Sequence, residues 1–201
     1  MIKNVIFDCG QVLVHFEPEY MVRQYVSNEA DVPLLTEVIF DRLYWNKLDE
    51  GTITNEEVLN ECHNRLPKRL WELCDEIYYG WIYNIPEIEG MRDLIKYIKE
   101  EFGVKTYLLS NISQYFAEHQ NEVEILSLLD GYVFSSSINK VKPDKAIYEH
   151  LLQKFNLKPE ECIFIDDRAE NIEAGQGVGI DGYAFDGDVN ALKEFLNSAL
   201  K

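Results

Sequence analysis

The sequence predicts an α/β protein in which a doubly wound parallel sheet carries an inserted bundle of helices. From residue 86 to the end of the 201-residue chain, short apolar runs typical of strands alternate with amphipathic helical segments. From Pro18 to about Tyr83, apolar residues recur at helical spacing and no strand-like run occurs. We therefore expect a core domain of residues 1–14 and 86–201, interrupted by a helical cap domain of residues 15–85.

The first predicted strand is the apolar run from Val5 to Phe7, which ends at a carboxylate, Asp8, with Gly10 two positions later. In open parallel sheets, ligands bind at the edge formed by the carboxyl ends of the strands. An acid at that position has no packing role, so Asp8 is a candidate functional residue. A turn or capping residue is the alternative interpretation.

The cap is predicted to contain four helices. Pro18 and Pro33 stand where first helical residues are expected. Thr54 and Glu57 form a capping box that opens another helix. The aromatic residues of this segment, Trp45 among them, are expected in its core rather than in contact with a substrate.

The core continues with alternating helices and strands, several of which have recognisable ends. Gly103 ends a helix of residues 91–102, and Asp188 is expected to cap the closing helix. Pro143 is expected to start a helix, which would place Lys142 just before it. The remaining predictions are strands at residues 104–109, 132–134, 162–165 and 180–185, and a helix over residues 113–129.

Composition limits the partners and the location of the protein. With 19 basic and 36 acidic residues, the net charge of −17 repels nucleic acids and anionic membranes. The four cysteines show neither paired nor metal-ligand spacing, which favours free thiols in a reducing cytosol. No stretch approaches 18 apolar residues, so we expect a cytoplasmic protein. The oligomeric state is not specified, and the sequence is compatible with a monomer.

Three predicted strands end in polar groups, at Asp8, at Ser110 and at the pair Asp166-Asp167. Parallel strands bring these groups to one edge of the sheet, where the carboxylates would repel unless a hard cation such as Mg²⁺ lies between them. The cation, Lys142 and the Ser110 hydroxyl would then form a local anion site. Taken singly, Ser110 is equally compatible with a cap, Lys142 with a solvated side chain, and the aspartate pair with a turn.

These residues resemble the four motifs of the haloacid dehalogenase-like (HAD) hydrolase superfamily, which has a Rossmann-like core. The matching segments are V-I-F-D-C-G-Q-V-L, Y-L-L-S-N, K-V-K-P-D and F-I-D-D-R-A-E-N. The helical insert is similar to a C1-type cap, and its stretch L-D-E-G-T-I-T-N-E-E-V is similar to one common in such caps. The first motif has the form D-x-G and the fourth the form D-D-x-x-x-N. In both respects the chain resembles the phosphatases of this superfamily typified by an α-glucose-1-phosphate phosphatase.

The resemblance implies a Mg²⁺-dependent hydrolase of a small phosphorylated metabolite, for example a sugar phosphate, acting through an aspartyl-phosphate on Asp8. Ser110 and Lys142 would bind the phosphate, with Asn111 either assisting or structural. The implied metal ligands are Asp8, the Gly10 carbonyl and Asp167. Asp166 would either bind the metal directly or contact one of its ligands. Asn171 would support this loop.

One position departs from the family pattern. Gly10 stands where family phosphatases carry a second Asp, the general acid for the leaving group. His15 and Glu17 are candidates to replace that acid, and exposed hinge residues are the alternative interpretation. A 2-haloacid dehalogenase and a weakly catalytic phosphometabolite-binding protein are therefore alternatives, although dehalogenases need no metal and the Asp166-Asp167 pair favours the phosphatase.

Overall fold

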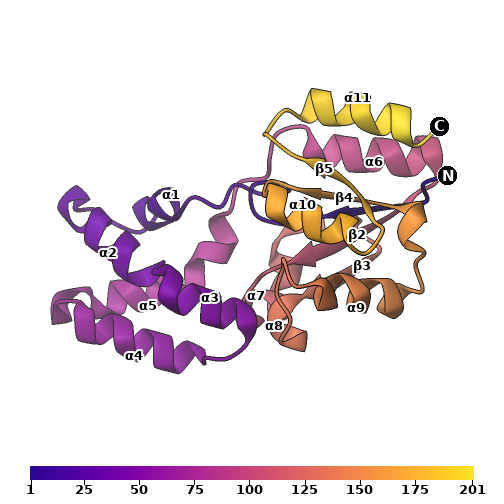
Figure 1. Ribbon diagram of the computed structural model, residues 1–201. Helices are drawn as coiled ribbons and strands as arrows, with labels where there is room; N and C mark the ends of the chain where they lie inside the picture. Colours follow the sequence, from indigo (N-terminus) through magenta and orange to yellow (C-terminus); the bar gives the residue numbers. More distant parts are fainter.

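The computed structural model describes residues 1–201 and contains one five-stranded sheet with helices on both faces (Figure 1). The strand order is β3-β2-β1-β4-β5, and all four neighbouring pairs are parallel. This order confirms the predicted doubly wound α/β fold. The strands are β1 (Asn4–Phe7), β2 (Lys105–Ser110), β3 (Gly131–Phe134), β4 (Cys162–Asp166) and β5 (Asp181–Ala184).

Alternate residues of the central strands face two separate hydrophobic clusters. Val5 and Phe7 of β1 pack into the larger cluster, with helices α6 (Met91–Phe102) and α11 (Val189–Ala199). Ile6 faces the other side of the sheet, with helices α9 (Lys145–Phe155) and α10 (Ala169–Gln176). Because both faces are covered, β1 is completely buried, and its carboxyl end is held rigidly.

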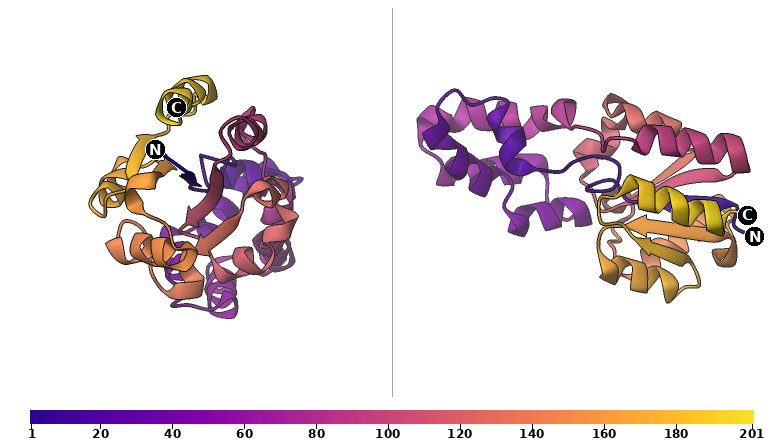
Figure 2. Two further views of the ribbon diagram at one scale, coloured as in Figure 1. Left: turned by 90° about the vertical axis from the view of Figure 1, so that its right-hand side faces the viewer. Right: turned by 90° about the horizontal axis from the view of Figure 1, so that it is seen from above.

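The chain between β1 and α6 forms a helical cap at the end of the molecule opposite the two termini (Figures 1 and 2). It holds five α-helices rather than the four expected, because the six-residue α1 is a separate helix. These helices are α1 (Pro18–Arg23), α2 (Val32–Ile39), α3 (Arg42–Glu50), α4 (Asn55–Arg65) and α5 (Trp71–Gly80). Short 3₁₀ turns lie at Glu29–Asp31, Lys68–Leu70 and Trp81–Asn84.

The cap contacts the core through its two linkers, through α3 and through α5, where Tyr115 Oη of the core donates to the Tyr79 carbonyl at 3.0 Å. Where the chain leaves and re-enters the core, the His15 amide donates to the Pro86 carbonyl at 2.8 Å, and the Ile88 amide donates to the Leu13 carbonyl at 3.0 Å. These bonds join the two linkers near the boundaries predicted for the cap domain. In the contact through α3, the C-terminal end of this helix meets the short core helix α8 (Ser135–Ile138).

Local sequence signals located most helix ends. The capping box of Thr54 and Glu57 forms as predicted, Asp188 caps α11, and Gly103 ends α6 in the left-handed region with φ +67°. Pro143 was expected to start a helix, and this was wrong. The Asp144 carboxylate accepts from the Ala146 amide, so Asp144 is the N-cap and α9 begins at Lys145.

The single helix predicted over residues 113–129 is broken. Helix α7 (Gln114–Glu118) is followed by 3₁₀ turns at Gln120–Glu122 and Glu124–Leu128. Val123 and Ile125 are both buried, yet residues two apart point to different sides of an α-helix. The irregular path allows both side chains to reach the core. A further 3₁₀ turn, Pro159–Glu161, precedes β4.

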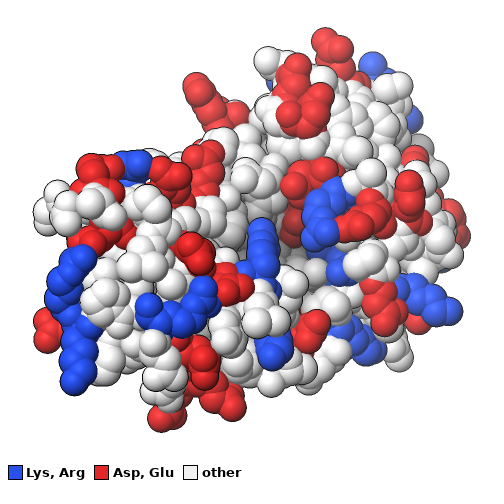
Figure 3. All heavy atoms as spheres, turned by 60° about the vertical axis from the view of Figure 1, so that its left-hand side comes forward, with Lys and Arg blue, Asp and Glu red and all other residues white.

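Acidic and basic side chains are interspersed over cap and core on the face drawn in Figure 3, and the whole chain carries 36 acidic and 19 basic residues. None of the helices combines the length and the apolar composition that a bilayer-spanning segment needs. All four cysteines are free thiols, as predicted, and all four are buried.

Candidate active site

Lys142 joins two of the strand-end carboxylates. Its ammonium lies 2.8 Å from Asp8 Oδ1, at the end of β1, and 2.7 Å from Asp166 Oδ2, at the end of β4. The Lys142 side chain is only 1% exposed. Burial lowers its pKa, but the two carboxylates outweigh burial and raise the pKa above its ordinary value. The lysine is therefore a fixed cation in the site.

Asp166 and Asp167 have different surroundings although they are neighbours in sequence. The fully buried Asp166 carboxylate also accepts from Asn171 Nδ2 and from the Arg168 amide. The Asp167 side chain is exposed and faces the cavity described below. Asp167 consequently offers free oxygen atoms, whereas Asp166 serves mainly to hold Lys142.

Three carboxylates converge at this edge of the sheet. Oxygen atoms of Asp8, Asp166 and Asp167 lie within 4.8 Å of one another. Burial raises the pKa of Asp8, an effect that Lys142 opposes and Asp166 reinforces. Burial and the neighbouring Asp166 also raise the pKa of Asp167. One lysine against three acids leaves excess negative charge, and an all-oxygen donor set of this kind suits a hard divalent cation such as Mg²⁺.

The end of β2 supplies Ser110 and Asn111. Ser110 is buried and lines the cavity next to the carboxylates. The Asn111 amide donates to the Lys142 carbonyl at 2.9 Å, and its oxygen accepts from the Lys142 amide at 2.7 Å. Asn111 thus fixes the main chain of the lysine, in agreement with the structural alternative, while also lining the cavity.

A cavity of about 180 Å³ lies between these strand ends and the cap. The core contributes Asp8, Gly10, Ser110 and Lys142 to its wall. The cap contributes one face of α3, where residues at positions i, i+3, i+4 and i+7 share a side of the helix. These residues are Arg42, Trp45, Asn46 and Asp49.

The structure does not bring His15 or Glu17 into this cavity. Their side chains are 43% and 60% exposed, and His15 lines a separate shallow pocket. Trp45 belongs to the hydrophobic core, as expected, but it also lines the active-site cavity, which was not expected. Sequence reasoning missed Asp49, although a polar stripe on the helix face that carries Trp45 is a signal in the sequence.

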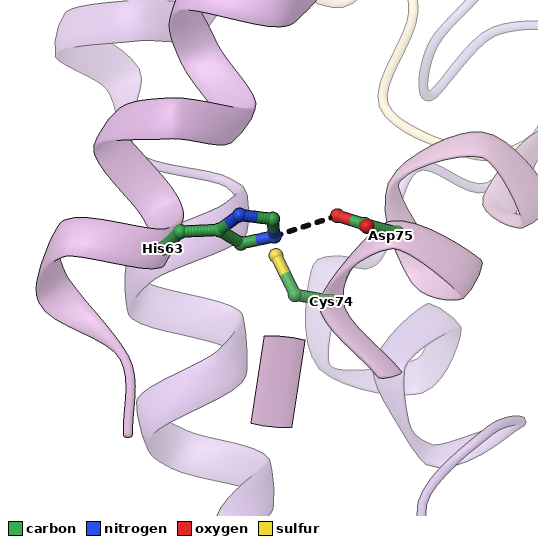
Figure 4. A group of neighbouring side chains, drawn as sticks. All are labelled: His63, Cys74 and Asp75. Atoms are coloured by element: carbon green, nitrogen blue, oxygen red, sulfur yellow. Dashed lines mark hydrogen bonds and ion pairs between the residues drawn. The ribbon is translucent and has the colours of Figure 1, made fainter. Parts of the chain in front are cut away.

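A second cluster of potential ligands lies in the cap, between α4 and α5 (Figure 4). His63 Nε2 is 2.8 Å from Asp75 Oδ1, and the imidazole stacks on Trp71 with ring centroids 4.7 Å apart. The Cys74 thiol points at this pair, and a hydrogen bond with Cys62, together with burial, raises the pKa of Cys74. A protonated thiol is a poor metal ligand, so these contacts are best explained as a link between two cap helices.

Residues 2–179 match the family of haloacid dehalogenase-like hydrolases. The chain belongs to this family. In this HAD-like hydrolase each of the four predicted motifs contributes to the wall of one cavity, through Asp8, Ser110, Lys142 and Asp167. Asp166 lies behind that wall, in contact with Lys142.

Several relatives of this HAD-like hydrolase are phosphatases. The D-ribitol-5-phosphate phosphatase of Bacteroides thetaiotaomicron is 24% identical over 198 residues, which cover 91% of each chain. A phosphorylated carbohydrates phosphatase of Thermotoga maritima is 26% identical over 182 residues, covering 89% of this chain and 82% of the relative. A HAD family enzyme of B. thetaiotaomicron, solved as a variant with magnesium and inorganic phosphate, has the same fold, with a TM-score of 0.71, 18% identity and coverage of 96% and 99%.

Proposed function

We propose that this HAD-like hydrolase is a Mg²⁺-dependent phosphomonoesterase that acts on a small phosphorylated metabolite through an aspartyl-phosphate on Asp8. The observation that carries the proposal is the position of the Asp8 carboxylate. It ends the central strand, faces the cavity and is held by Lys142 at 2.8 Å. A carboxylate fixed in this way is suited to in-line attack on phosphorus.

The proposed metal ligands are Asp8, the main-chain carbonyl of Gly10 and Asp167. All three residues line the cavity, and the oxygens of the two aspartates belong to the carboxylate cluster. Asp166 is proposed to act from behind, because its oxygens already accept from Lys142, Asn171 and the Arg168 amide. When bound, the cation would screen the negative charges of the nucleophile and the phosphate.

The remaining groups bind and orient the phosphate. Lys142 is proposed to bind the transferring oxygens as a fixed point charge, and the Ser110 hydroxyl to donate a hydrogen bond to them. Asn171 and Asn111 act indirectly, by holding Asp166 and the main chain of Lys142. These contacts keep the charged groups in place before the substrate arrives, so little reorganisation is needed during the reaction.

The proposed substrate class is a phosphorylated polyol or sugar, with α-glucose 1-phosphate as one member. Only three of the fifteen residues that line the cavity are hydrophobic, namely Phe16, Trp45 and Ile112. Gln11, Arg42 and Asn46 instead offer hydrogen-bond donors, which suit the hydroxyl groups of such a molecule. The names of the two phosphatase relatives, which act on ribitol phosphate and on phosphorylated carbohydrates, support the same class.

The experiment is a phosphate-release assay on a panel of phosphorylated polyols and sugars, run with Mg²⁺ and with EDTA. We expect turnover with Mg²⁺, none in EDTA, and none in a folded Asp8→Asn variant, because an amide cannot form the acyl-phosphate. Halide release from a 2-haloacid in EDTA would instead identify a dehalogenase. Tight phosphate binding without turnover would identify a binding protein.

A further inference from the structure

The cavity holds a nucleophile, but the core carries no acid at position 10, two residues after it. Gly10, two residues after Asp8, has no side chain to give a proton to a leaving alcohol. An alkoxide is a poor leaving group, and proton transfer by a side chain is typically worth about 10²–10⁴-fold in such a step. The ionisable residues that line the cavity are Asp8, Arg42, Asp49, Lys142, Asp167 and Arg168.

Most of these groups are unsuited to proton transfer. Arg42 and Arg168 do not lose their protons in the accessible pH range. Lys142 is fixed between Asp8 and Asp166. Asp8 is the nucleophile and Asp167 a metal ligand in the proposed function, on which this inference rests. Asp49 is the remaining group, and it approaches the cavity from the cap side, opposite the carboxyl ends of the strands.

The position of Asp49 has no structural explanation. It lies in the last turn of α3, where a negative charge is unfavourable because the helix dipole is negative there. Its carboxyl is half-buried and takes part in none of the hydrogen bonds or ion pairs found in the structure. A carboxyl that is partly desolvated and unpartnered costs stability, which is typical of a functional group.

The main chain of Asp49, in contrast, is fixed on the core. Ser135 Oγ donates to the Asp49 carbonyl at 2.6 Å. Asn139 Nδ2 donates to the next carbonyl, that of Glu50, at 2.9 Å. Gly51 follows with φ +68°, and a Cβ there would lie 2.6 Å from the Ser136 carbonyl oxygen. This close docking holds Asp49 at the wall of the cavity.

The protonation behaviour of Asp49 agrees with this placement. Burial raises its pKa to about 7, with Arg42 opposing and Asp8 reinforcing the change. Lys142 and Glu50 are the other charged groups near the carboxyl, and their effects are smaller and opposite. Both forms of Asp49 are therefore populated near neutral pH, as an acid that must later act as a base requires.

We propose that Asp49 is the general acid and base of this hydrolase. As Asp8 attacks phosphorus and the bond to the leaving oxygen breaks, the Asp49 carboxyl gives that oxygen its proton. Water then attacks the aspartyl-phosphate, and the Asp49 carboxylate takes one proton from the water as the bond between Asp8 and phosphorus breaks. Alcohol and inorganic phosphate are released, and Asp49 is again protonated. The acid missing at Gly10 is thus supplied by the cap.

The test compares two leaving groups in Asp49→Asn, with Mg²⁺ present. An alkyl phosphate should be hydrolysed about 10²–10⁴-fold more slowly than by the wild type. With p-nitrophenyl phosphate, whose leaving group needs no proton, the rate of the p-nitrophenolate burst should stay within about a few-fold of the wild-type rate. Turnover should slow, and phosphorylated enzyme should accumulate and be detectable by mass spectrometry.

Asp49→Glu retains the carboxyl and should recover part of the alkyl activity. Glu50→Gln, which removes the adjacent exposed carboxylate, is the matched control and should behave like the wild type.

Two results would overturn the proposal. Unchanged hydrolysis of the alkyl phosphate by Asp49→Asn would mean that another group supplies the proton. An equal loss in the alkyl rate and in the p-nitrophenolate burst would mean that Asp49 acts on binding or folding. Full activity of a folded Asp8→Asn enzyme would instead contradict the proposed aspartyl-phosphate route itself. Failure of the inference and failure of the proposed function are therefore distinguishable.

Discussion

The Asn171 amide nitrogen lies 2.9 Å and 3.0 Å from the two carboxylate oxygens of Asp166. Together with Lys142 and the Arg168 amide, this contact occupies the oxygens of Asp166 with protein donors. Adjacent Asp167 has no comparable partners and faces the cavity. The two neighbouring acids therefore have separate tasks, one holding the lysine and the other open to a ligand.

From this difference we predict opposite effects of two substitutions. Asp167→Ala should weaken Mg²⁺ binding more than Asp166→Ala, measured by calorimetric titration. Asp166→Ala should cost more stability, about 3 kcal/mol in urea unfolding, because it leaves part of a buried ion pair unpaired. If Asp166→Ala showed the larger loss of Mg²⁺ affinity, the assignment of the pair would be reversed.

Lys142→Met should be strongly destabilising. The substitution leaves the buried carboxylates of Asp8 and Asp166 without their shared cation, and loss of one partner of a buried pair costs about 3–5 kcal/mol. Urea unfolding measures the loss, and added Mg²⁺ should reduce it. Lys145→Met, at an exposed lysine three residues away, is the control and should change stability little. A stable Lys142→Met enzyme would show that the pair contributes nothing to the fold.

Asp49→Asn should stabilise the protein, and the gain should grow as pH rises. The pKa of Asp49 is about 7 in the folded state, against 3.8 for the free side chain. Between these values the folded state binds a proton that the unfolded state has lost, so wild-type stability falls as pH rises and levels off above about 7. Partial exposure limits the gain to roughly 2 kcal/mol at pH 8, with little difference at pH 4. The stability difference is measured from the melting temperatures of the variant and the wild type at both pH values. An equal difference at each pH would contradict the raised pKa of Asp49.

Gly10→Asp should restore alkyl phosphatase activity in the Asp49→Asn background. The backbone at Gly10 is not in the left-handed region, and a Cβ there would meet only Phe16 Cβ, at an ordinary 3.6 Å. A side chain can therefore begin there without a clash, and the carbonyl proposed as a metal ligand is retained. Rates on alkyl phosphates should rise while Mg²⁺ affinity stays within about a few-fold of the parent, since one acid replaces another near the leaving group. Gly10→Ala is the control and should give no recovery.

Gly51→Ala and Gly103→Ala together test whether catalysis depends on the docking of the cap and not only on an unstrained backbone. Gly51 has φ +68° and closely approaches the Ser136 carbonyl, whereas Gly103 has φ +67° with open space around it. Both alanine variants should lose about 1 kcal/mol or more through the unfavourable dihedral angle. Only Gly51→Ala should also lose activity on alkyl phosphates, because the end of α3 must move away from the core. Equal activity in the two variants would show that this docking does not position Asp49.

The features that the sequence predicted correctly are those governed by local chemistry. The capping box at Thr54, the cap at Asp188 and the left-handed Gly103 depend on residues within a few positions of each other, so each is visible in the chain itself. The convergence of Asp8 with Asp166 and Asp167 was also predictable, because parallel strands bring their carboxyl ends to one edge.

The features that were missed depend on packing between distant segments. Residues 113–129 have an apolar pattern compatible with a helix, but burial of both Val123 and Ile125 requires a broken path. Asp49 reaches the site only because α3 docks on α8, through Ser135, a residue 86 positions away. No rule of local spacing relates those two segments, so His15 and Glu17, which are closer to Asp8 in sequence, were the candidates named instead.

The single face of α3 that carries Arg42, Asn46 and Asp49 links two properties that are usually considered separately. The first two residues are placed to contact the body of the substrate, and the third to protonate its leaving oxygen. A change in this helix that admits a different alcohol will therefore also alter how readily that alcohol is expelled. In a family of such hydrolases that diverges by exchanging cap sequences, the choice of substrate and the tolerance for poor leaving groups would evolve as one trait.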